Sequence, residues 1–321
     1  MPEAAAPARV PVVGLLLGAG AAAALTMVLV LLLGGGAPPA AVPGLPTAGP
    51  VLDWTLAVSP LASNLLAAAV VGLFLLASGL LHSTGRTQAA AAAAATLAVG
   101  WVVLSLLLAS VAALRIQQLA PPSAFWAEVA GSGQVRASVS TAVLAAVAGA
   151  VVRARPRLGF CLVLVALIPE ALTGHVRTAE APALTTVMVF VHVVAASLWL
   201  GGLVALGWTA LRHPASWSEQ LTGFSRMALG CVVVLVVTGS VSALAVGGGL
   251  GALVRSEYGV VVSLKAVLLL ALATIGLLQR RYVIAHGSRS RRDFVLLAGS
   301  ELILMGLVFS LATGLSQTPP M

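Results

Sequence analysis

Five ionisable side chains interrupt stretches of the sequence that are otherwise apolar. They are Glu170, His175, His192, Lys265 and Glu301. Imidazole and carboxylate groups can bind a metal ion or carry a proton, and an amine can pair with a carboxylate. Ionisable groups are costly in an apolar environment and by default indicate a functional site. We therefore expect the chemistry of this chain at these positions.

The segment FVHVVAASLWLGGLVAL, residues 190–206, contains one of these histidines. Met188, His192 and Trp199 are spaced i, i+4 and i+11, which places them along one face of a helix. A thioether and an imidazole one turn apart suit Cu(I), whereas Mg²⁺ and Ca²⁺ prefer clustered carboxylates. We expect His192 to be a metal ligand, with Met188 and His175 as further ligands.

Each of these residues also has a purely structural interpretation. A membrane histidine can serve only as a hydrogen-bond donor between helices, and a methionine is often a packing residue. Lys265 could pair with Glu170 or Glu301 and contribute only to stability, or reach toward the membrane interface. The two cysteines, Cys161 and Cys231, lie in apolar runs, and we expect small core residues there and no disulfide.

The composition determines the class of protein in which these residues lie. Of 321 residues, 60% are hydrophobic and 8% charged, and the apolar runs show no alternation with polar residues. Only helices and closed barrels satisfy every backbone group in a bilayer, and such runs favour helices. We predict an all-α, polytopic transmembrane bundle. The net charge of +8 is interpreted as a topology signal, and no nucleic-acid partner is expected.

A window of about 20 residues per span predicts nine transmembrane segments. The first is interpreted as a retained anchor, the alternative being a cleaved secretory signal. A Pro/Gly-rich outside loop, 34–60, follows it, and Asp53 and Trp54 suit the membrane interface. We divide the chain into N-terminal helices, 1–152, and a second helical region, 153–321. The predicted spans are 12–33, 62–81, 89–113, 137–152, 158–173, 184–211, 221–246, 258–279 and 293–313.

The arginines predict the orientation of these spans. If the N-terminus lies inside, twelve arginines fall at cytoplasmic ends and four fall on the opposite side. Such a bias favours an inside N-terminus and an outside C-terminus. The inside set is Arg9, Arg86, Arg153, Arg155, Arg157, Arg212, Arg226, Arg280, Arg281, Arg289, Arg291 and Arg292, and the outside set is Arg115, Arg136, Arg177 and Arg255.

Several motifs that would indicate an enzyme or a pump do not occur. The sequence has no GxxxxGK[ST] phosphate loop, no CxxC and no HExxH. We therefore expect neither an enzyme nor an ATP-driven pump.

Five phrases of the sequence, in this order, resemble the CopD family of copper-resistance membrane proteins. They are TGH, VHVVAASLWLGGLVAL, FSRMALGCVVVLVVTG, YGVVVSLKAVLLLALATIGLLQRR and ELILMGLVFSLATGLSQTPP, which cover about residues 160–320. Two departures occur: Gly223 where the family often has a basic residue, and Gln279 where it often has asparagine. Neither departure removes a candidate ligand.

The resemblance implies copper handling at the cytoplasmic, or inner, membrane, commonly import or delivery from the outer side. It implies as partners, besides the lipid bilayer, a periplasmic or extracellular copper-binding protein and cytochrome oxidase assembly factors. Some relatives carry a fused assembly module, which we do not expect here. The family pattern, carried over to this chain, marks His192, Trp199, Gly201, Gly202, Arg226, Tyr258, Gly259, Lys265, Arg280 and Glu301. Gly201 and Gly202 are further expected to allow close helix packing.

Two other functions remain open from the residues. His175 or His192 could ligate haem in a b-type cytochrome, which a Soret band would reveal. Alternatively, the bundle could hold copper for oxidase assembly without transporting it. Both copper functions require the same metal site.

Overall fold

The computed structural model describes residues 12–38, 46–81, 87–173, 182–212, 217–246, 257–286 and 291–317. Every regular element in these ranges is a helix, as predicted. The helices are α1 (Val12–Leu33), α2 (Pro50–Ala77), α3 (Thr87–Leu119), α4 (Phe125–Gly131), α5 (Gly133–Val151), α6 (Pro156–Val165), α7 (Ile168–Ala171), α8 (Pro182–Arg212), α9 (Trp217–Val246), α11 (Glu257–His286) and α12 (Arg291–Gln317).

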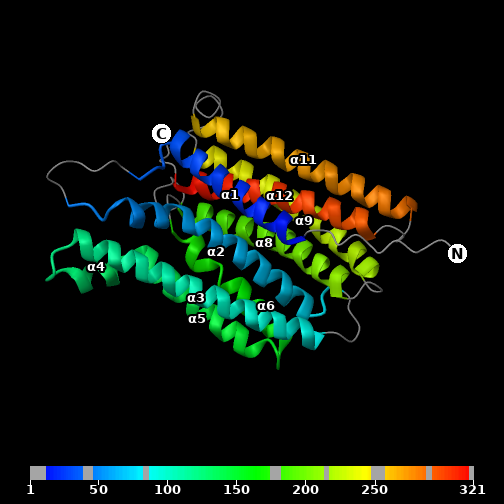
Figure 1. Cartoon of the computed structure of the whole chain (residues 1–321), viewed down its shortest axis with the longest axis horizontal. Helices are drawn as coiled ribbons and strands as arrows, with labels where there is room; N and C mark the ends of the chain where they lie inside the picture. Colours follow the sequence, from blue (N-terminus) through cyan, green and yellow to red (C-terminus); the bar gives the residue numbers. More distant parts are fainter. Residues whose placement is uncertain are drawn as a thin grey trace.

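The long helices run side by side along the longest axis of the molecule (Figure 1). Helices α5, α3, α2, α8 and α9 pack in succession, and α12 packs against α1, α11, α2 and α8. Buried side chains form one core cluster centred on α2, α3 and α5 and another centred on α8, α9 and α12. Helix α8 contributes to both, through Ala205 and Leu203 respectively. Helix α2 also contributes to both, through Ala67 and Ala68, so these two helices link the clusters.

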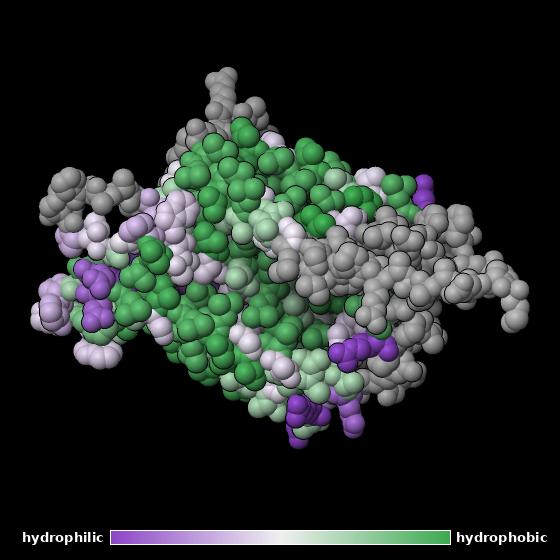
Figure 2. Space-filling model, viewed as in Figure 1, coloured by the Kyte–Doolittle hydropathy of each residue, from purple (hydrophilic) through white to green (hydrophobic). Residues whose placement is uncertain are grey.

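The surface has the distribution expected of a protein that spans a membrane. Apolar residues cover the middle of the face shown in Figure 2, and hydrophilic residues gather toward its ends. Six of the described helices, α2, α3, α5, α8, α9 and α11, are long and apolar enough to cross a bilayer. Large apolar side chains such as Val103, Leu107, Val260 and Leu270 are exposed. The chain is a multi-pass membrane protein.

The predicted outside loop, 34–60, is shorter than expected, because α2 begins at Pro50. Proline suits the first turn of a helix, where its missing N–H is not needed. Gly49 precedes it with a φ of 88°, a left-handed conformation that favours glycine. Asp53 in the first turn suits the positive end of the helix dipole. Even Pro60 lies within α2, so prolines in this region do not mark a loop throughout.

The fifth predicted segment, 158–173, is not one continuous helix. Helix α6 ends at Val165, and the four-residue α7 begins at Ile168. Pro169 cannot donate a hydrogen bond to the carbonyl of Val165, and its ring would clash with that carbonyl in a continuous helix. The apolar composition indicated the length of the segment correctly, but the proline divides it.

Helices α2 and α8 touch backbone to backbone at Gly72 and Gly201. A Cβ atom added to Gly72 would overlap the carbonyl oxygen of Gly201, and one added to Gly201 would overlap the carbonyl oxygen of Ala68. Gly202 faces α9, where an added Cβ would lie 2.7 Å from Cε of Met227. Both glycines of the pair at 201 and 202 therefore lie at helix crossings.

We predict that Gly201→Ala destabilises the bundle, because its methyl group would push α2 away from α8. Overpacking of this kind costs about 1–3 kcal/mol of unfolding free energy. Gly207→Ala is the matched control, since an added Cβ there meets nothing within 4 Å. Unfolding of the purified protein in detergent measures both, and equal stability of the two variants would contradict the close crossing.

Candidate functional site

Polar side chains from three different helices meet between α8, α9 and α11. Nδ1 of His192 on α8 lies 2.9 Å from Oγ1 of Thr238 on α9. Nε2 of the same ring lies 3.4 Å from Nζ of Lys265 on α11. The side chains of His192 and Lys265 are half-buried, and Thr238 is buried. We call these three residues the histidine site.

Thr238 determines which nitrogen of the ring carries the proton. Its hydroxyl group donates to the backbone carbonyl of Val234, one turn earlier in α9, at 2.7 Å. A hydroxyl has a single proton, so Oγ1 can only accept a hydrogen bond from the ring. Nδ1 of His192 therefore carries its hydrogen and donates to Thr238. Nε2 keeps its lone pair and accepts from the ammonium group of Lys265.

A neutral imidazole with a free lone pair is the form of histidine that binds metal ions. Metal-binding histidines usually donate their other N–H to a fixed acceptor, which orients the ring. Thr238 fills that role for His192. Gly239 lies beside the ring, since a Cβ added there would make an ordinary contact of 3.5 Å with Cε1 of His192. The ring is thus oriented by α9 and presents Nε2 to α11.

Lys265 pairs with neither Glu170 nor Glu301, the two carboxylates predicted as its partners. Across the described ranges the salt bridge found is between Arg115 and Asp53, at 2.7 Å, and it joins the end of α3 to the start of α2. The interpretation in which Lys265 pairs with Glu170 or Glu301 is therefore wrong. The lysine instead donates to His192.

Glu170 belongs to a different polar cluster. Oγ of Ser63 donates to Oε1 of Glu170 at 2.7 Å, and Nε1 of Trp101 donates to Oγ of Ser63 at 3.3 Å. Ser63 and Trp101 are fully buried. This chain of hydrogen bonds joins α3, α2 and α7 within the first core cluster and has no contact with the histidine site that the structure records.

Glu301 lies on α12 and is buried, with 4% of its surface exposed. Gly276 of α11 faces it, since a Cβ added to this glycine would lie 3.4 Å from Oε1 of Glu301. Gly276 comes eleven residues after Lys265, which corresponds to about 16 Å along the helix. Glu301 therefore lies at a different depth from the histidine site.

The other predicted residues are more scattered. Met188 is half-buried on α8, one turn before His192, and Trp199 is buried in the second core cluster. Arg226 is exposed on α9, and Tyr258 lies in the first turn of α11. His175 lies outside the described residues.

The cysteines behave differently from one another. Both are free, but Cys231 is buried and Cys161 is exposed. The prediction of a core position is wrong for Cys161, because α6 buries Gly159 and Val163 and Cys161 points the opposite way.

The histidine site contains one side chain of a type that binds metal ions strongly, His192. Within the described part of the chain, no group of three or more His, Cys, Asp and Glu residues could hold a metal ion.

The sequence analysis did not identify Thr238 and Ser63, whose hydroxyl groups form hydrogen bonds with His192 and Glu170 respectively. The available signal was the polar run TGS, residues 238–240, inside an apolar span at the predicted depth of His192.

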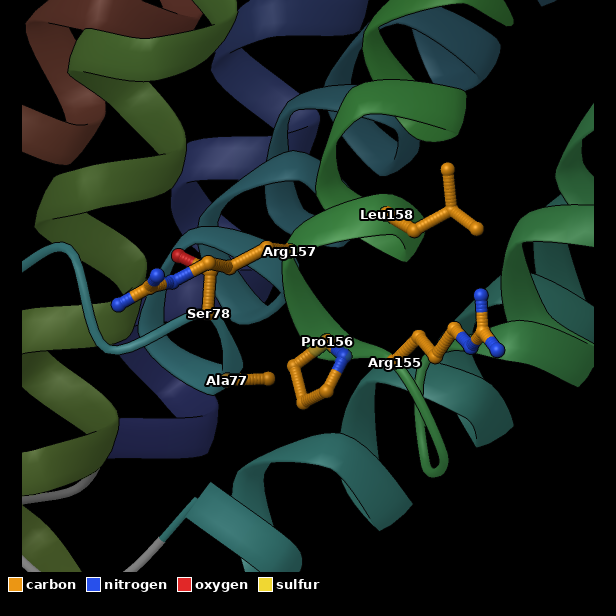
Figure 3. Close-up of a pocket in the computed structure, with 6 residues that line it drawn as sticks. All are labelled: Ala77, Ser78, Arg155, Pro156, Arg157 and Leu158. Carbon is orange, nitrogen blue, oxygen red and sulfur yellow. The ribbon is translucent and has the colours of Figure 1, made fainter.

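A cavity of about 320 Å³ lies between the end of α2 and the start of α6, at the predicted cytoplasmic end. Figure 3 shows the arginine side chains that line it, Arg155 and Arg157, pointing to opposite sides. Their charges do not converge on one point. The cavity is therefore not a concentrated anion site, and both arginines suit the predicted cytoplasmic membrane surface.

Two comparisons find that part of this chain is similar to proteins whose names refer to copper. Residues 218–315 match the model of a family described as CopD, copper resistance protein D. The predicted resemblance is confirmed over that range, which contains Thr238, Lys265 and Glu301; His192 precedes it.

A curated relative, the copper transport protein CutJ of Bacillus subtilis (strain 168), is 28% identical over 116 residues. The alignment covers 34% of this chain and 21% of the relative, so the chain spans about a fifth of the length of the protein that it matches. No solved structure matches the chain.

We predict that Ser63→Ala destabilises the protein by about 1–3 kcal/mol, because it leaves the buried Trp101 N–H and Glu170 without their shared partner. Ser59→Ala is the control from the preceding turn of α2, since the buried Oγ of Ser59 has no partner within the described residues. Chemical unfolding in detergent compares them. A larger loss for Ser59→Ala would contradict this assignment.

We predict that Thr238→Val abolishes the preference for the Nδ1–H form of His192 in protein that also carries Lys265→Met, because valine cannot accept from Nδ1 and methionine cannot donate to Nε2. Lys265 would otherwise keep the hydrogen on Nδ1, so every variant in this test carries Lys265→Met. Thr238→Ser keeps the hydroxyl and should keep the preference. Nitrogen-15 NMR of histidine-labelled protein distinguishes the two ring forms, with His192→Ala identifying the signal. An unchanged Nδ1–H signal in Thr238→Val would show that another group orients the ring.

Proposed function

We propose that this chain is a non-enzymatic copper-handling protein of the cytoplasmic membrane that moves copper from the outer side toward the cytoplasm through His192. The observation that carries the proposal is the geometry of His192, whose Nδ1 faces Thr238 and whose Nε2, left without a hydrogen, faces Lys265 inside the bundle. The match of residues 218–315 to the copper resistance protein D family supports copper as the ion.

The proposed topology has nine crossings, with the N-terminus inside and the C-terminus outside. Helices α6 and α7 together form the fifth crossing, which Pro169 interrupts. The arginine distribution supports this orientation. It places both Asp53, at the start of α2, and Arg115, at the end of α3, on the outer side, which agrees with their ion pair.

In this topology His192 lies ten residues, or about 15 Å, inward from the outer end of α8 at Pro182. Copper arriving from outside would reach Nε2 before the inner half of the bundle. Met188, one turn closer to the outer end, and His175 are the proposed additional ligands on the entry side. A site with few ligands suits transport, because an ion must bind strongly enough to enter and weakly enough to leave.

The membrane potential supplies the driving force for inward movement. An inside-negative potential favours entry of a cation by about 2.3 kcal/mol per charge per 100 mV. A phosphate loop is therefore not required for net copper uptake. Lys265 and Glu301 are proposed to shape the route, with the carboxylate of Glu301 at the deeper level.

The partners of this function are the lipid bilayer and, on the outer side, a copper-binding protein that supplies the ion. Cytochrome oxidase assembly factors are the proposed recipients on the delivery route. These partners extend the copper function and do not change the role of His192.

Copper uptake into proteoliposomes with an inside-negative potential tests the proposal. We expect His192→Ala to reduce uptake to the level of empty vesicles, because the oriented lone pair is lost. Cys231→Ser is the control. It removes a soft ligand from the core cluster centred on α8, α9 and α12, and it should leave uptake unchanged. Matched protein content and helix content exclude a folding defect.

Uptake by His192→Ala at the rate of the unsubstituted protein would remove His192 from the route. Uptake that depends on Cys231 instead would assign the ion to the thiol.

A further inference from the structure

We propose that Lys265 competes with the incoming metal ion for Nε2 of His192 and thereby sets the affinity of the histidine site. The inference rests on the proposed function, because it takes His192 as the copper ligand. It adds to that function a residue that weakens binding so that the ion can be released.

The competition follows from the geometry of the ring. An imidazole nitrogen has one lone pair, and the ammonium group of Lys265 accepts none and only donates. A metal ion on an imidazole nitrogen lies about 2 Å from it. Nζ of Lys265 lies 3.4 Å from Nε2 along the hydrogen bond, which would leave about 1.4 Å between Nζ and the ion. The two cations therefore cannot use Nε2 together.

Lys265 also lacks the partner that would explain it as a structural residue. Among the carboxylates whose side chains the structure describes, Asp53, Glu128, Glu170 and Glu301, none forms a salt bridge with it. Glu301 faces Gly276, about 16 Å farther along α11, which is beyond the reach of a lysine side chain. A cation held inside a bundle without a carboxylate costs free energy. A residue that is kept despite this cost indicates a functional site by default. Its recorded partner is the lone pair that the metal needs.

The hydrogen bond is long, at 3.4 Å, so it can be exchanged readily for a metal–nitrogen bond. When the lysine occupies Nε2, the fraction of molecules able to bind copper falls, and the apparent dissociation constant rises by the inverse of that fraction. After copper binds, the displaced ammonium repels the bound cation and favours its release. The side chain keeps its charge throughout, so the competition needs no proton transfer.

Anaerobic titration of the purified full chain with Cu(I), against a chelating dye, tests the inference. Lys265→Met keeps a side chain of similar length without the charge, and we expect it to bind Cu(I) at least about tenfold more tightly, because all molecules then expose Nε2. Lys265→Arg keeps a donor cation and should bind within about threefold of the unsubstituted protein. The double variant Lys265→Met/His192→Ala should bind as weakly as His192→Ala.

Equal or weaker binding by Lys265→Met, with His192→Ala still impaired, would overturn the competition and leave the proposed function intact. Binding that does not depend on His192 would overturn both. Lys265→Gln must bind Cu(I) more tightly as well, because it removes the charge without adding a thioether, which is itself a Cu(I) ligand. A gain in Lys265→Met alone would assign the effect to the thioether and overturn the competition, and Lys265→Gln also serves if Lys265→Met does not fold.

A spectroscopic readout separates displacement from a general effect on stability. Lys265 is the sole lysine in the sequence, so lysine labelled with nitrogen-15 at Nζ gives a single side-chain signal. Adding Ag(I), a redox-inert ion of the same charge as Cu(I), should shift this signal in the unsubstituted protein and leave it unchanged in His192→Ala. A signal that does not respond to Ag(I) in the unsubstituted protein would contradict displacement.

Discussion

The backbone contact between α2 and α8 is the constraint on which the rest of the bundle depends. At Gly72 and Gly201 the two helices approach so closely that neither residue can carry a side chain. Helix α8 is thereby fixed against the core of α2, α3 and α5, and its opposite side packs on α9. The position of His192 relative to α9 and α11 follows, because it lies nine residues from this crossing on the same helix.

A second constraint, the scarcity of hydrogen-bond partners inside a membrane, explains the chemistry of the histidine site. A ring N–H in this environment must find an acceptor, and Thr238 supplies one while its own proton bonds the carbonyl of Val234. The ring is left with one usable lone pair, and Lys265 covers it. In the proposed function this arrangement would offer a metal ion a single oriented ligand and a competitor, which suits passage better than storage.

The sequence predicted the helices well because each long apolar run must hydrogen-bond internally in a bilayer. The sequence also places His192 and Lys265 eight and seven residues from the outer ends of the predicted spans 184–211 and 258–279, which agrees with the contact between the two side chains. It could not predict Thr238 as the partner, because hydroxyl residues are common in membrane helices. Most of them, like Thr26 and Thr274, bond only to their own helix. The break at Pro169 was missed because the span was predicted from apolar composition alone, which does not register that proline cannot donate to the carbonyl of Val165.

The central claim is that copper binds at Nε2 of a ring held by Thr238. X-ray absorption spectroscopy of the Cu(I)-loaded, purified chain tests it most directly, because an imidazole ligand gives a characteristic outer-shell scattering pattern. If copper binds at Nε2 of His192, imidazole scattering is expected in the unsubstituted protein and is lost in His192→Ala at matched copper content. A copper spectrum without imidazole scattering, or one that is the same in both proteins, would contradict the account.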